Sequence, residues 1–438
     1  MKKLSFLFGA LALAALVSCS SDEVVSQPNG AANLSKQSIS FAPLATKTTR
    51  STVYSPTSMF TNFRVIGMWQ SAVTNAWIEG KEYVTGTPGD NQTQFTPTPV
   101  AGGLYQGFSD VMFSSGTPSV DYKGLEIVSS GTGWDYKDQS KVQYWPYSAQ
   151  MSGANITGYN CIALKFRAVA PANTSLNLEG GDFTYTTPAV ASQVDICYAE
   201  TNEGKTVTDA PVQMAFHHLF SQVIFKAKKA SNYTVDIKSI TIGGVGTVAT
   251  IPFTTIQKTT NVCLSDDNVT ITAPTDFPGF TSASYTSIPD QDADASPAQI
   301  TPAGQELILL PQNITKWDLT ASASDSGQGY VAIEYRAKTK DAATWATNTE
   351  NDGFKTVYFP LNAKWYSGKK YIYTLLFGGV EDPDDPGTND PENPDPGTEP
   401  DDNPGGYDEE GNPEAPTVPI TFTASVNDWT EQVVDIDI

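Results

Sequence analysis

Histidine is nearly absent from this sequence of 438 residues, in which His217 and His218 are the only two. Neighbouring residues on a strand point to opposite faces, so these two side chains are not expected to hold one metal ion together. A Ser–His–Asp site would need one of them, and no GxSxG motif supports it. CxxC pairs and Ca²⁺-loop patterns are also missing. We therefore expect no enzyme activity, no catalytic residue, no metal site and no cofactor, although a glycosidase would need only two carboxylates.

Positive charge is absent from the end of the chain, since no Lys or Arg follows Lys370. Residues 371–438 hold 18 of the 48 acidic residues, and the preceding part has 30 acidic and 26 basic residues. The net charge of −22 therefore comes mainly from the tail. Without a basic patch, nucleic-acid binding is not expected. The acidic stretch favours a solvated, extended segment rather than a site for a cationic partner.

Sustained helical periodicity is also missing beyond the N-terminus, whereas aromatic residues make up 11% of the chain and Gly and Pro number 34 and 29. This composition favours strands and turns. Strand-like segments recur at intervals of about ten to twenty residues, as in all-β sandwiches. They lie at residues 39–41, 63–69, 143–146, 161–169, 183–188, 194–199, 233–242, 306–312, 317–319, 331–335 and 371–377.

The stretch at residues 209–228 divides these segments into two groups. Val223, Phe225 and Ala227 alternate with Ile224, Lys226 and Lys228, which predicts one buried face and one face toward water. We expect this strand to open a second β-sandwich. Further on, the apolar phase slips by one residue between Ile237 and Ile240, which predicts a β-bulge in a strand that ends at Gly243-Gly244.

The N-terminus has the form of an export signal. Lys2 and Lys3 precede an apolar run over residues 4–17, which is short for a membrane span. The run ends in Leu-Val-Ser-Cys19, which resembles the lipobox of bacterial lipoproteins, where the Cys after the cleavage site is acylated. Each buried methylene contributes roughly 0.8 kcal/mol, so several acyl chains anchor a protein durably. The alternative is an ordinary secretory signal in which Cys19 occurs by chance.

We predict six segments from these patterns: a lipoprotein signal peptide over residues 1–18, a flexible tether over 19–38, an N-terminal β-sandwich over 39–208, a C-terminal β-sandwich over 209–380, an acidic Pro-rich linker over 381–416 and a C-terminal strand over 417–438. Besides Cys19, three cysteines remain, Cys161, Cys197 and Cys263. An export compartment would permit one disulfide among them, and buried free thiols are equally compatible with the pattern.

An ordered set of short motifs resembles the fimbrillins, the family of fimbrial subunit lipoproteins of Gram-negative anaerobes. The motifs are the Cys19 lipobox, ISF at 39–41 with Thr49-Arg50, YWP at 144–146, FTYTTP at 183–188, VDICYA at 194–199, FHHLFSQVIFKA at 216–227, LLPQ at 309–312 and GKKYIYTL at 368–375. They run in family order over nearly the whole mature chain.

The resemblance implies a fold, a maturation route and a mode of assembly. The fold would be two transthyretin-like β-sandwiches in tandem. The subunit would be carried to the outer membrane as a surface-exposed lipoprotein and cut between Arg50 and Ser51, which would release residues 39–50; Lys47 is an alternative cleavage site. The vacated groove would then accept an extended strand from another fimbrial subunit.

Two questions stay open at this point. Residues 417–438 are the candidate donor strand, but a strand on a long tether could equally pair within its own sandwich. The second question is the function itself, because a surface lipoprotein that binds glycan without assembling would carry the same anchor. Aromatic residues such as Tyr105, Phe108 and Trp134 could bind a glycan or lie in the core.

Overall fold

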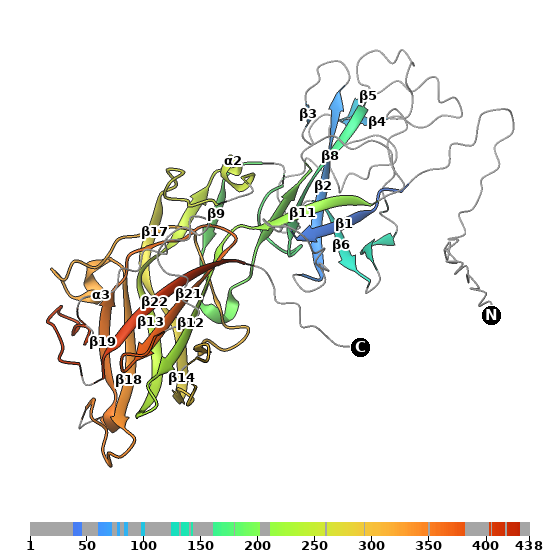
Figure 1. Cartoon of the computed structure of the whole chain (residues 1–438). Helices are drawn as coiled ribbons and strands as arrows, with labels where there is room; N and C mark the ends of the chain where they lie inside the picture. Colours follow the sequence, from blue (N-terminus) through green and yellow to red (C-terminus); the bar gives the residue numbers. More distant parts are fainter. Residues whose placement is uncertain are drawn as a thin grey trace, which may run out of the picture. The chain divides into compact units, whose positions relative to one another are not determined.

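The computed structural model of the chain describes residues 38–45, 60–71, 77–78, 83–85, 98–100, 124–130, 133–139, 142, 161–178, 180–201, 211–258, 261–292, 294–348, 351–381, 403, 405–416 and 418–429. Strands dominate these residues (Figure 1). The helices within the same ranges are short and include η5 (Val190–Ser192), α2 (Phe253–Ile256), α3 (Ala323–Ser326) and η6 (Asn351–Gly353). The predicted all-β class is confirmed.

The first large sheet contains eight strands in the order β1-β11-β10-β8-β2-β6-β7, with β3 paired to β2. These strands are β1 (Phe41–Ala45), β2 (Asn62–Ser71), β3 (Trp77–Ile78), β6 (Leu125–Ser129), β7 (Trp134–Tyr136), β8 (Cys161–Ala170), β10 (Cys197–Glu200) and β11 (Val212–His218). One buried cluster lies on this sheet and is rich in aromatic rings, among them Phe41, Phe63, Phe166 and Phe216. A separate two-stranded pair joins β4 (Tyr83–Thr85) and β5 (Thr98–Val100).

Two five-stranded sheets enclose the largest buried cluster. One has the order β15-β12-β21-β22 with β16 paired to β12, and the other has the order β14-β13-β18-β19 with β9 paired to β13. Their inner faces both contribute to one core, so the two sheets form a sandwich. The strands are β9 (Phe183–Thr186), β12 (Ser221–Lys229), β13 (Tyr233–Ile251), β14 (Ile271–Ser287), β15 (Ala298–Gln299), β16 (Leu307–Leu309), β18 (Tyr330–Thr339), β19 (Lys355–Pro360), β21 (Lys369–Phe377) and β22 (Ile420–Asp428), and a small pair joins β17 (Asn313–Ile314) to β20 (Ala363–Lys364).

Strand β13 contains the predicted irregularity. Its register against both β14 and β18 shifts between Ile237 and Ser239, so the expected β-bulge is confirmed. The prediction that Gly243-Gly244 ends the strand is wrong, because β13 continues to Ile251. A Cβ at Gly243 would lie 2.1 Å from the Tyr330 ring, and one at Gly244 would lie 2.1 Å from the carbonyl oxygen of Gln328. These glycines do not end the strand. They allow the residues at the start of β18 to approach the β13 backbone closely.

Strand β12 departs from the predicted alternation on one face. Val223, Phe225 and Ala227 lie in the sandwich core, as expected. The opposite face is not open to water, since Ile224 and Lys228 are also buried. Strand β12 lies between β21 on one side and β15 and β16 on the other, and a central strand has neighbouring side chains along both edges.

The chain passes between the eight-stranded sheet and the sandwich three times, from β8 to β9, from β9 to β10 and from β11 to β12. Strand β11 lies in the sheet of β1, whereas β9, which comes earlier in the chain, pairs with β13 in the sandwich. A third buried cluster gathers residues from both regions, including Tyr198 and Phe220. These crossings show that sheet membership does not follow chain order here. The division of the chain at residues 208 and 209 stays a prediction.

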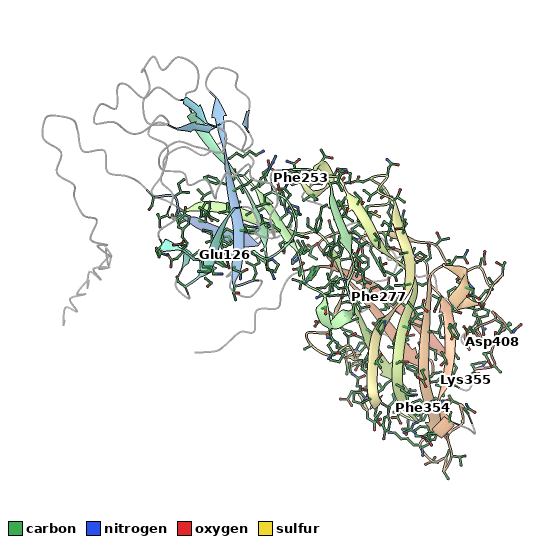
Figure 2. The ribbon with its side chains drawn as sticks, turned by 180° about the vertical axis from the view of Figure 1, so that it is seen from behind. Glu126, Phe253, Phe277, Phe354, Lys355 and Asp408 are labelled. Carbon is green, nitrogen blue, oxygen red and sulfur yellow. The ribbon has the colours of Figure 1, made fainter. Side chains whose placement is uncertain are left out.

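Part of the acidic linker lies against the sandwich. Residues 405–416, here called the docked segment, contact the edge strand β19 through Tyr407, whose N–H donates to the Tyr358 carbonyl and whose carbonyl accepts from the Tyr358 N–H, both at 2.9 Å. Lys355 on β19 and Glu414 form an ion pair at 2.6 Å. Figure 2 labels Lys355 and also Asp408 of the docked segment. The solvated linker predicted over residues 381–416 therefore includes a portion with ordered contacts.

Candidate functional site

Strand β1 forms one end of the eight-stranded sheet and pairs only with β11 among the described strands (Figure 1). The pairing is parallel, from Phe41 opposite Val212 to Ala45 opposite Phe216. The Val212 N–H donates to the Ser40 carbonyl at 2.8 Å. A strand at the end of a sheet can leave without breaking the ladder of the remaining strands.

The inner face of β1 is deeply buried. Ile39 has no exposed surface, and Phe41 is 3% exposed. The Phe41 ring packs edge-on against Phe166 at 5.2 Å between ring centroids, and Tyr136 donates a hydrogen bond to the Ile39 carbonyl at 2.9 Å. Removing this segment would leave an apolar slot beside unpaired backbone groups of β11.

The residues predicted to be processed are not among those that the structure describes. Cys19, Arg50 and Ser51, together with the alternative Lys47, are outside the described residues. The structure therefore places the segment that precedes the predicted cut, but not the cut itself.

Strand β22 forms the end of the sheet that contains β12 and β21 (Figure 1). It pairs antiparallel with β21 over nine positions, from Phe377 opposite Ile420 to Lys369 opposite Asp428. The side chains of Val418, Ile420 and Val426 are buried in the sandwich core. In the single chain, the C-terminal segment thus completes its own sandwich, which is one of the two alternatives that the sequence leaves open.

Polar and aromatic contacts hold the far end of β22. The Lys369 ammonium and the Asp428 carboxylate form an ion pair at 2.6 Å, and the Trp429 N–H donates to the Gly368 carbonyl at 2.9 Å. The Trp429 indole stacks on the His218 imidazole with centroids 4.2 Å apart and an interplanar angle of 9°. The end of β22 is therefore attached both to β21 and to β11.

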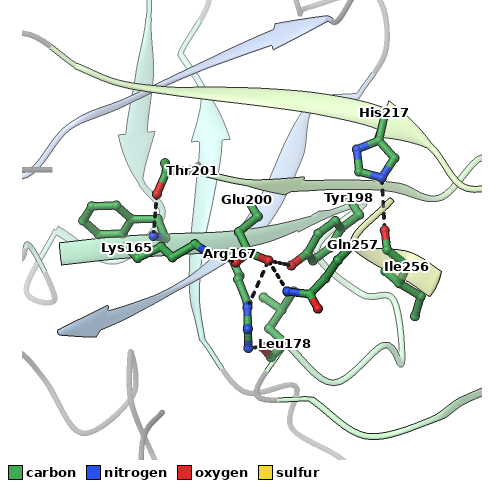
Figure 3. Close-up of polar contacts among 10 residues, drawn as sticks. Lys165, Arg167, Leu178, Tyr198, Glu200, Thr201, His217, Ile256 and Gln257 are labelled. Atoms are coloured by element: carbon green, nitrogen blue, oxygen red, sulfur yellow. Dashed lines mark hydrogen bonds and ion pairs between the residues drawn. The ribbon is translucent and has the colours of Figure 1, made fainter. Parts of the chain in front are cut away.

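A polar cluster centred on Glu200 joins β8, β10 and the end of α2 (Figure 3). The Glu200 carboxylate accepts hydrogen bonds from Tyr198 at 2.6 Å and from Gln257 at 2.7 Å. It also forms ion pairs with Lys165 and with Arg167, the latter at 3.3 Å. The Arg167 guanidinium in turn donates to the Leu178 carbonyl at 3.3 Å.

The electrostatics of this cluster favour the ionised carboxylate. Burial by itself raises the pKa of Glu200, but hydrogen bonds from Gln257, Lys165 and Tyr198 and the charge of Arg167 outweigh it and lower the pKa. The cluster satisfies a buried charge with several donors and stabilises the contact between the sheet and α2. We therefore assign the cluster a structural role.

His217 and His218 contact different partners. His217 donates from Nε2 to the Ile256 carbonyl at 3.2 Å, and burial lowers its pKa to about 4. His218 contacts the Asp195 carboxylate through Nδ1 at 2.7 Å.

His218 belongs to a group of potential metal ligands. The Cys197 sulfur lies 3.5 Å from His218 Nδ1 and 3.4 Å from Asp195 Oδ2. Within the part of the chain that the structure describes, this is the group of three His, Cys or acidic residues whose ligand atoms converge. Cys197 and Cys263 are both buried and form no disulfide with each other.

Sequence reasoning missed the Glu200 cluster, the docked segment and the group around His218. The motif VDICYA held a signal for the last of these, since Asp195 and Cys197 are two residues apart and share one face of an extended segment. The pairing of Cys197 with His218 depends on sheet register, which the sequence does not reveal. Of the aromatic residues considered for glycan binding, Trp134 packs against Phe63 at 5.3 Å between centroids, and Tyr105 and Phe108 are outside the described residues.

Among the described residues, no helix has both the length and the apolar character needed to cross a membrane.

Comparison with solved structures finds similar chains at low sequence identity. A protein from Bacteroides ovatus proposed to act in cell adhesion has 11% identity and a TM-score of 0.37, with 91% of this chain and 100% of that chain covered. A fimbrial assembly protein from Parabacteroides distasonis has 14% identity and a TM-score of 0.28, covering 78% and 91%. The tip fimbrial protein Mfa3 from Porphyromonas gingivalis, with a C-terminal truncation, has 8% identity and a TM-score of 0.32, covering 84% and 94%. Comparison with curated proteins gives no significant match.

A family model settles the relationship that these distant structures do not. The model described as fimbrillin-like matches residues 49–389, which is most of the chain. It spans strands of both the eight-stranded sheet and the sandwich. The chain belongs to the fimbrillin-like family.

Proposed function

We propose that this protein is a structural or adhesive subunit of a cell-surface fimbria that assembles by strand exchange. Strand β1 is the segment that is lost, and its place is taken by an extended strand of a neighbouring subunit. The observation that carries the proposal is that β1 occupies a sheet end while its inner face is buried. Family membership supports the same role.

The energetics favour replacement over an empty groove. Burial of an apolar side chain contributes roughly 1.5–3 kcal/mol, so losing Ile39 and Phe41 removes several kcal/mol of stability. The β11 groups that pair with β1 would also lose their partners. An incoming strand with apolar residues at alternate positions restores both contributions, which is the known mode of strand addition to a sheet edge.

Strand β22 is the candidate donor within this chain. It lies at a sheet end. Val418, Ile420 and Val426 are separated by even numbers of residues and therefore lie on one face of the strand. Donation would require the nine-residue pairing with β21 to open. A subunit whose β22 stays paired with its own β21 would receive a strand without donating one. Such a subunit would lie at an end of a fimbria.

Maturation follows from the N-terminal signals. Acylation at Cys19 anchors the precursor in the outer membrane, and cleavage between Arg50 and Ser51 releases the anchor together with β1. The partners are other fimbrial subunits, and the role is not enzymatic.

The test is controlled cleavage of the purified precursor with a trypsin-like protease. We expect a product that begins at Ser51 by N-terminal sequencing and that forms polymers visible by electron microscopy. Arg50→Gln is the matched control and should abolish that product, or shift the cut to the alternative Lys47. A chain cut at Arg50 that stays monomeric under all conditions would contradict assembly by strand exchange.

The donor is tested separately with a chain that stops after residue 416. Removing β22 should leave cleavage at Arg50 intact and abolish self-polymerisation. Added peptide covering residues 417–438 should then bind the cleaved chain. Unchanged polymerisation of the truncated chain would show that another segment is the donor.

A further inference from the structure

We propose that Asp195, Cys197 and His218 form a binding site for one thiophilic divalent cation, with Zn²⁺ as its natural occupant. Cys197 on β10 lies directly opposite His218 on β11 in the antiparallel ladder. Asp195 precedes Cys197 by two residues, and its Oδ2 reaches both of them. Directly paired strands hold such side chains within reach of a common point.

The distances between the ligand atoms match a tetrahedral centre. With Zn–S of about 2.3 Å and Zn–N and Zn–O of about 2.0–2.2 Å, tetrahedral angles place sulfur about 3.5 Å from the nitrogen and from the oxygen. The observed separations are 3.5 Å for sulfur to His218 Nδ1 and 3.4 Å for sulfur to Asp195 Oδ2. The nitrogen and oxygen are 2.7 Å apart and would separate to about 3.3 Å once a cation lies between them. A side-chain rotation of Asp195 supplies this change.

The surroundings of the three ligands suit a cation. Cys197 is 1% exposed, and Asp195 Oδ1 is a buried oxygen that accepts no hydrogen bond among the described residues. The carboxylate therefore has spare capacity to bind a positive charge. Trp429 stacks on the face of the His218 ring, and a metal at Nδ1 would lie in the plane of that ring, so the two contacts are compatible.

A hydrogen-bonded pair of Asp195 and His218 with a nearby thiol is the simpler interpretation. It accounts for the 2.7 Å contact, but it gives the Cys197 sulfur, 3.4 Å from Asp195 Oδ2 and 3.5 Å from His218 Nδ1, only weak thiol contacts. A thiol nucleophile activated by His218 fits less well. Sulfur and carboxylate both approach the same ring atom, Nδ1, so the imidazole does not link them through its two nitrogens as a catalytic triad requires.

Binding would join β10, β11 and the segment before β10 at one point. The Cys197 thiol loses its proton to solvent as the sulfur–metal bond forms, and His218 coordinates as neutral imidazole with its proton on Nε2. A water molecule completes the coordination. Because Trp429 covers His218, an ordered His218 also presents a fixed surface to the end of the C-terminal segment.

Cobalt titration of the purified protein tests the site, after metals have been removed with a chelator. We expect saturation at one Co²⁺ per chain, with a thiolate-to-cobalt absorption band in the near ultraviolet, and displacement of Co²⁺ by Zn²⁺. Zn²⁺ should raise the unfolding temperature of the metal-free protein by several degrees. Absence of binding, or binding without the thiolate band, would overturn the proposal.

Two variants locate the site within the chain. Cys197→Ser should remove the thiolate band and weaken binding by at least about 100-fold, and Asp195→Asn should weaken binding with the band retained. Cys263→Ser, at the other buried cysteine, is the matched control and should bind as the unaltered protein does. Circular dichroism establishes that each variant is folded. If both Cys197→Ser and Cys263→Ser lose the thiolate band equally, or if neither loses it, the metal binds at another place and the proposal is wrong.

Discussion

The indole of Trp429 lies flat against the imidazole of His218, with ring centroids 4.2 Å apart. This contact joins the end of β22 to β11, the same strand that pairs with β1 through residues such as Phe216. The two segments proposed to exchange during assembly therefore both contact β11. The C-terminal segment and the removable N-terminal segment lie on different sheets, yet they share this neighbour.

Trp429→Ala should loosen the C-terminal strand. Loss of a large buried aromatic side chain destabilises its surroundings by about 3 kcal/mol or more. Amide hydrogens of β22 should exchange roughly 100-fold faster with solvent, whereas those of β13 should change little. Val194→Ala, at an exposed apolar residue, is the control and should leave exchange unaltered. Unchanged protection of β22 in Trp429→Ala would show that pairing with β21 alone holds the strand.

Phe41→Ala should weaken the attachment of β1. Phe41 packs against Phe63, Tyr136 and Phe166, so truncation leaves a cavity and should destabilise this sheet by about 3–5 kcal/mol. We expect faster cleavage at Arg50 and faster amide exchange in β11. Ala42→Ser, at a half-buried neighbour on the same strand, should behave as the unaltered protein does. Equal cleavage rates in the two variants would show that the burial of β1 does not control the rate of cleavage at Arg50.

Glu200→Gln should lower stability in a pH-dependent manner. The pKa of Glu200 lies below its ordinary value of 4.5 in the folded protein, so the ionised carboxylate adds stability that is present above pH 4.5 and is lost as the pH falls through the folded value. At pH 7 the variant removes the buried carboxylate charge that forms an ion pair with Arg167, which should cost about 3 kcal/mol. Urea unfolding should show that this difference shrinks below pH 4.5.

Glu126→Gln provides the control for that measurement. Glu126 pairs with Lys137, whose side chain is 62% exposed, and exposed pairs contribute about 0–1 kcal/mol. Its effect on the free energy of unfolding at pH 7 should be small. A pH profile for Glu200→Gln parallel to that of the unaltered protein would contradict the role given to the cluster.

Tyr407→Ala should release the docked segment from β19. Tyr407 packs against Trp317 at 6.3 Å between centroids and pairs with Tyr358 through two backbone hydrogen bonds. The Tyr358 amide should exchange at least ten-fold faster, equivalent to about 1.4 kcal/mol, because the edge of β19 becomes exposed. The tether of β22 would also lengthen, so polymerisation of the cleaved chain should accelerate. Glu410→Gln, at an exposed position of the same segment, should change neither rate.

Local patterns were sufficient to predict much of the β architecture. Alternation at Val223, Phe225 and Ala227 identified a core strand, and the phase slip after Ile237 located a bulge. Both depend on the two-residue period of a strand, which is written directly in the order of residues. The prediction of a strand end at Gly243 and Gly244 is wrong because the residues that approach these glycines, Tyr330 and Gln328, are distant in sequence.

The candidate sites depend on contacts between residues far apart in the chain. Asp195 and Cys197 were visible as neighbours, but His218 joins them only through the pairing of β10 with β11. Glu200 gains Lys165 from β8 and Gln257 from beyond α2. The docked segment was predicted to be solvated from its own composition, since Tyr407 finds Trp317 and Tyr358 only on the folded sandwich.

The order of residues alone determined the all-β class, the positions of many core strands and the resemblance to fimbrillins, because each is encoded by short-range periodicity and short motifs. Strands β14 and β19 were not predicted, and the segment 317–319, expected to be a strand, is not one. Tertiary structure alone decided that β1 and β22 lie at sheet ends, that β22 pairs with β21 in its own chain, and which side chains meet around Glu200 and His218. Strand order and register arise from burying many distant apolar faces at once, and no local segment contains that information.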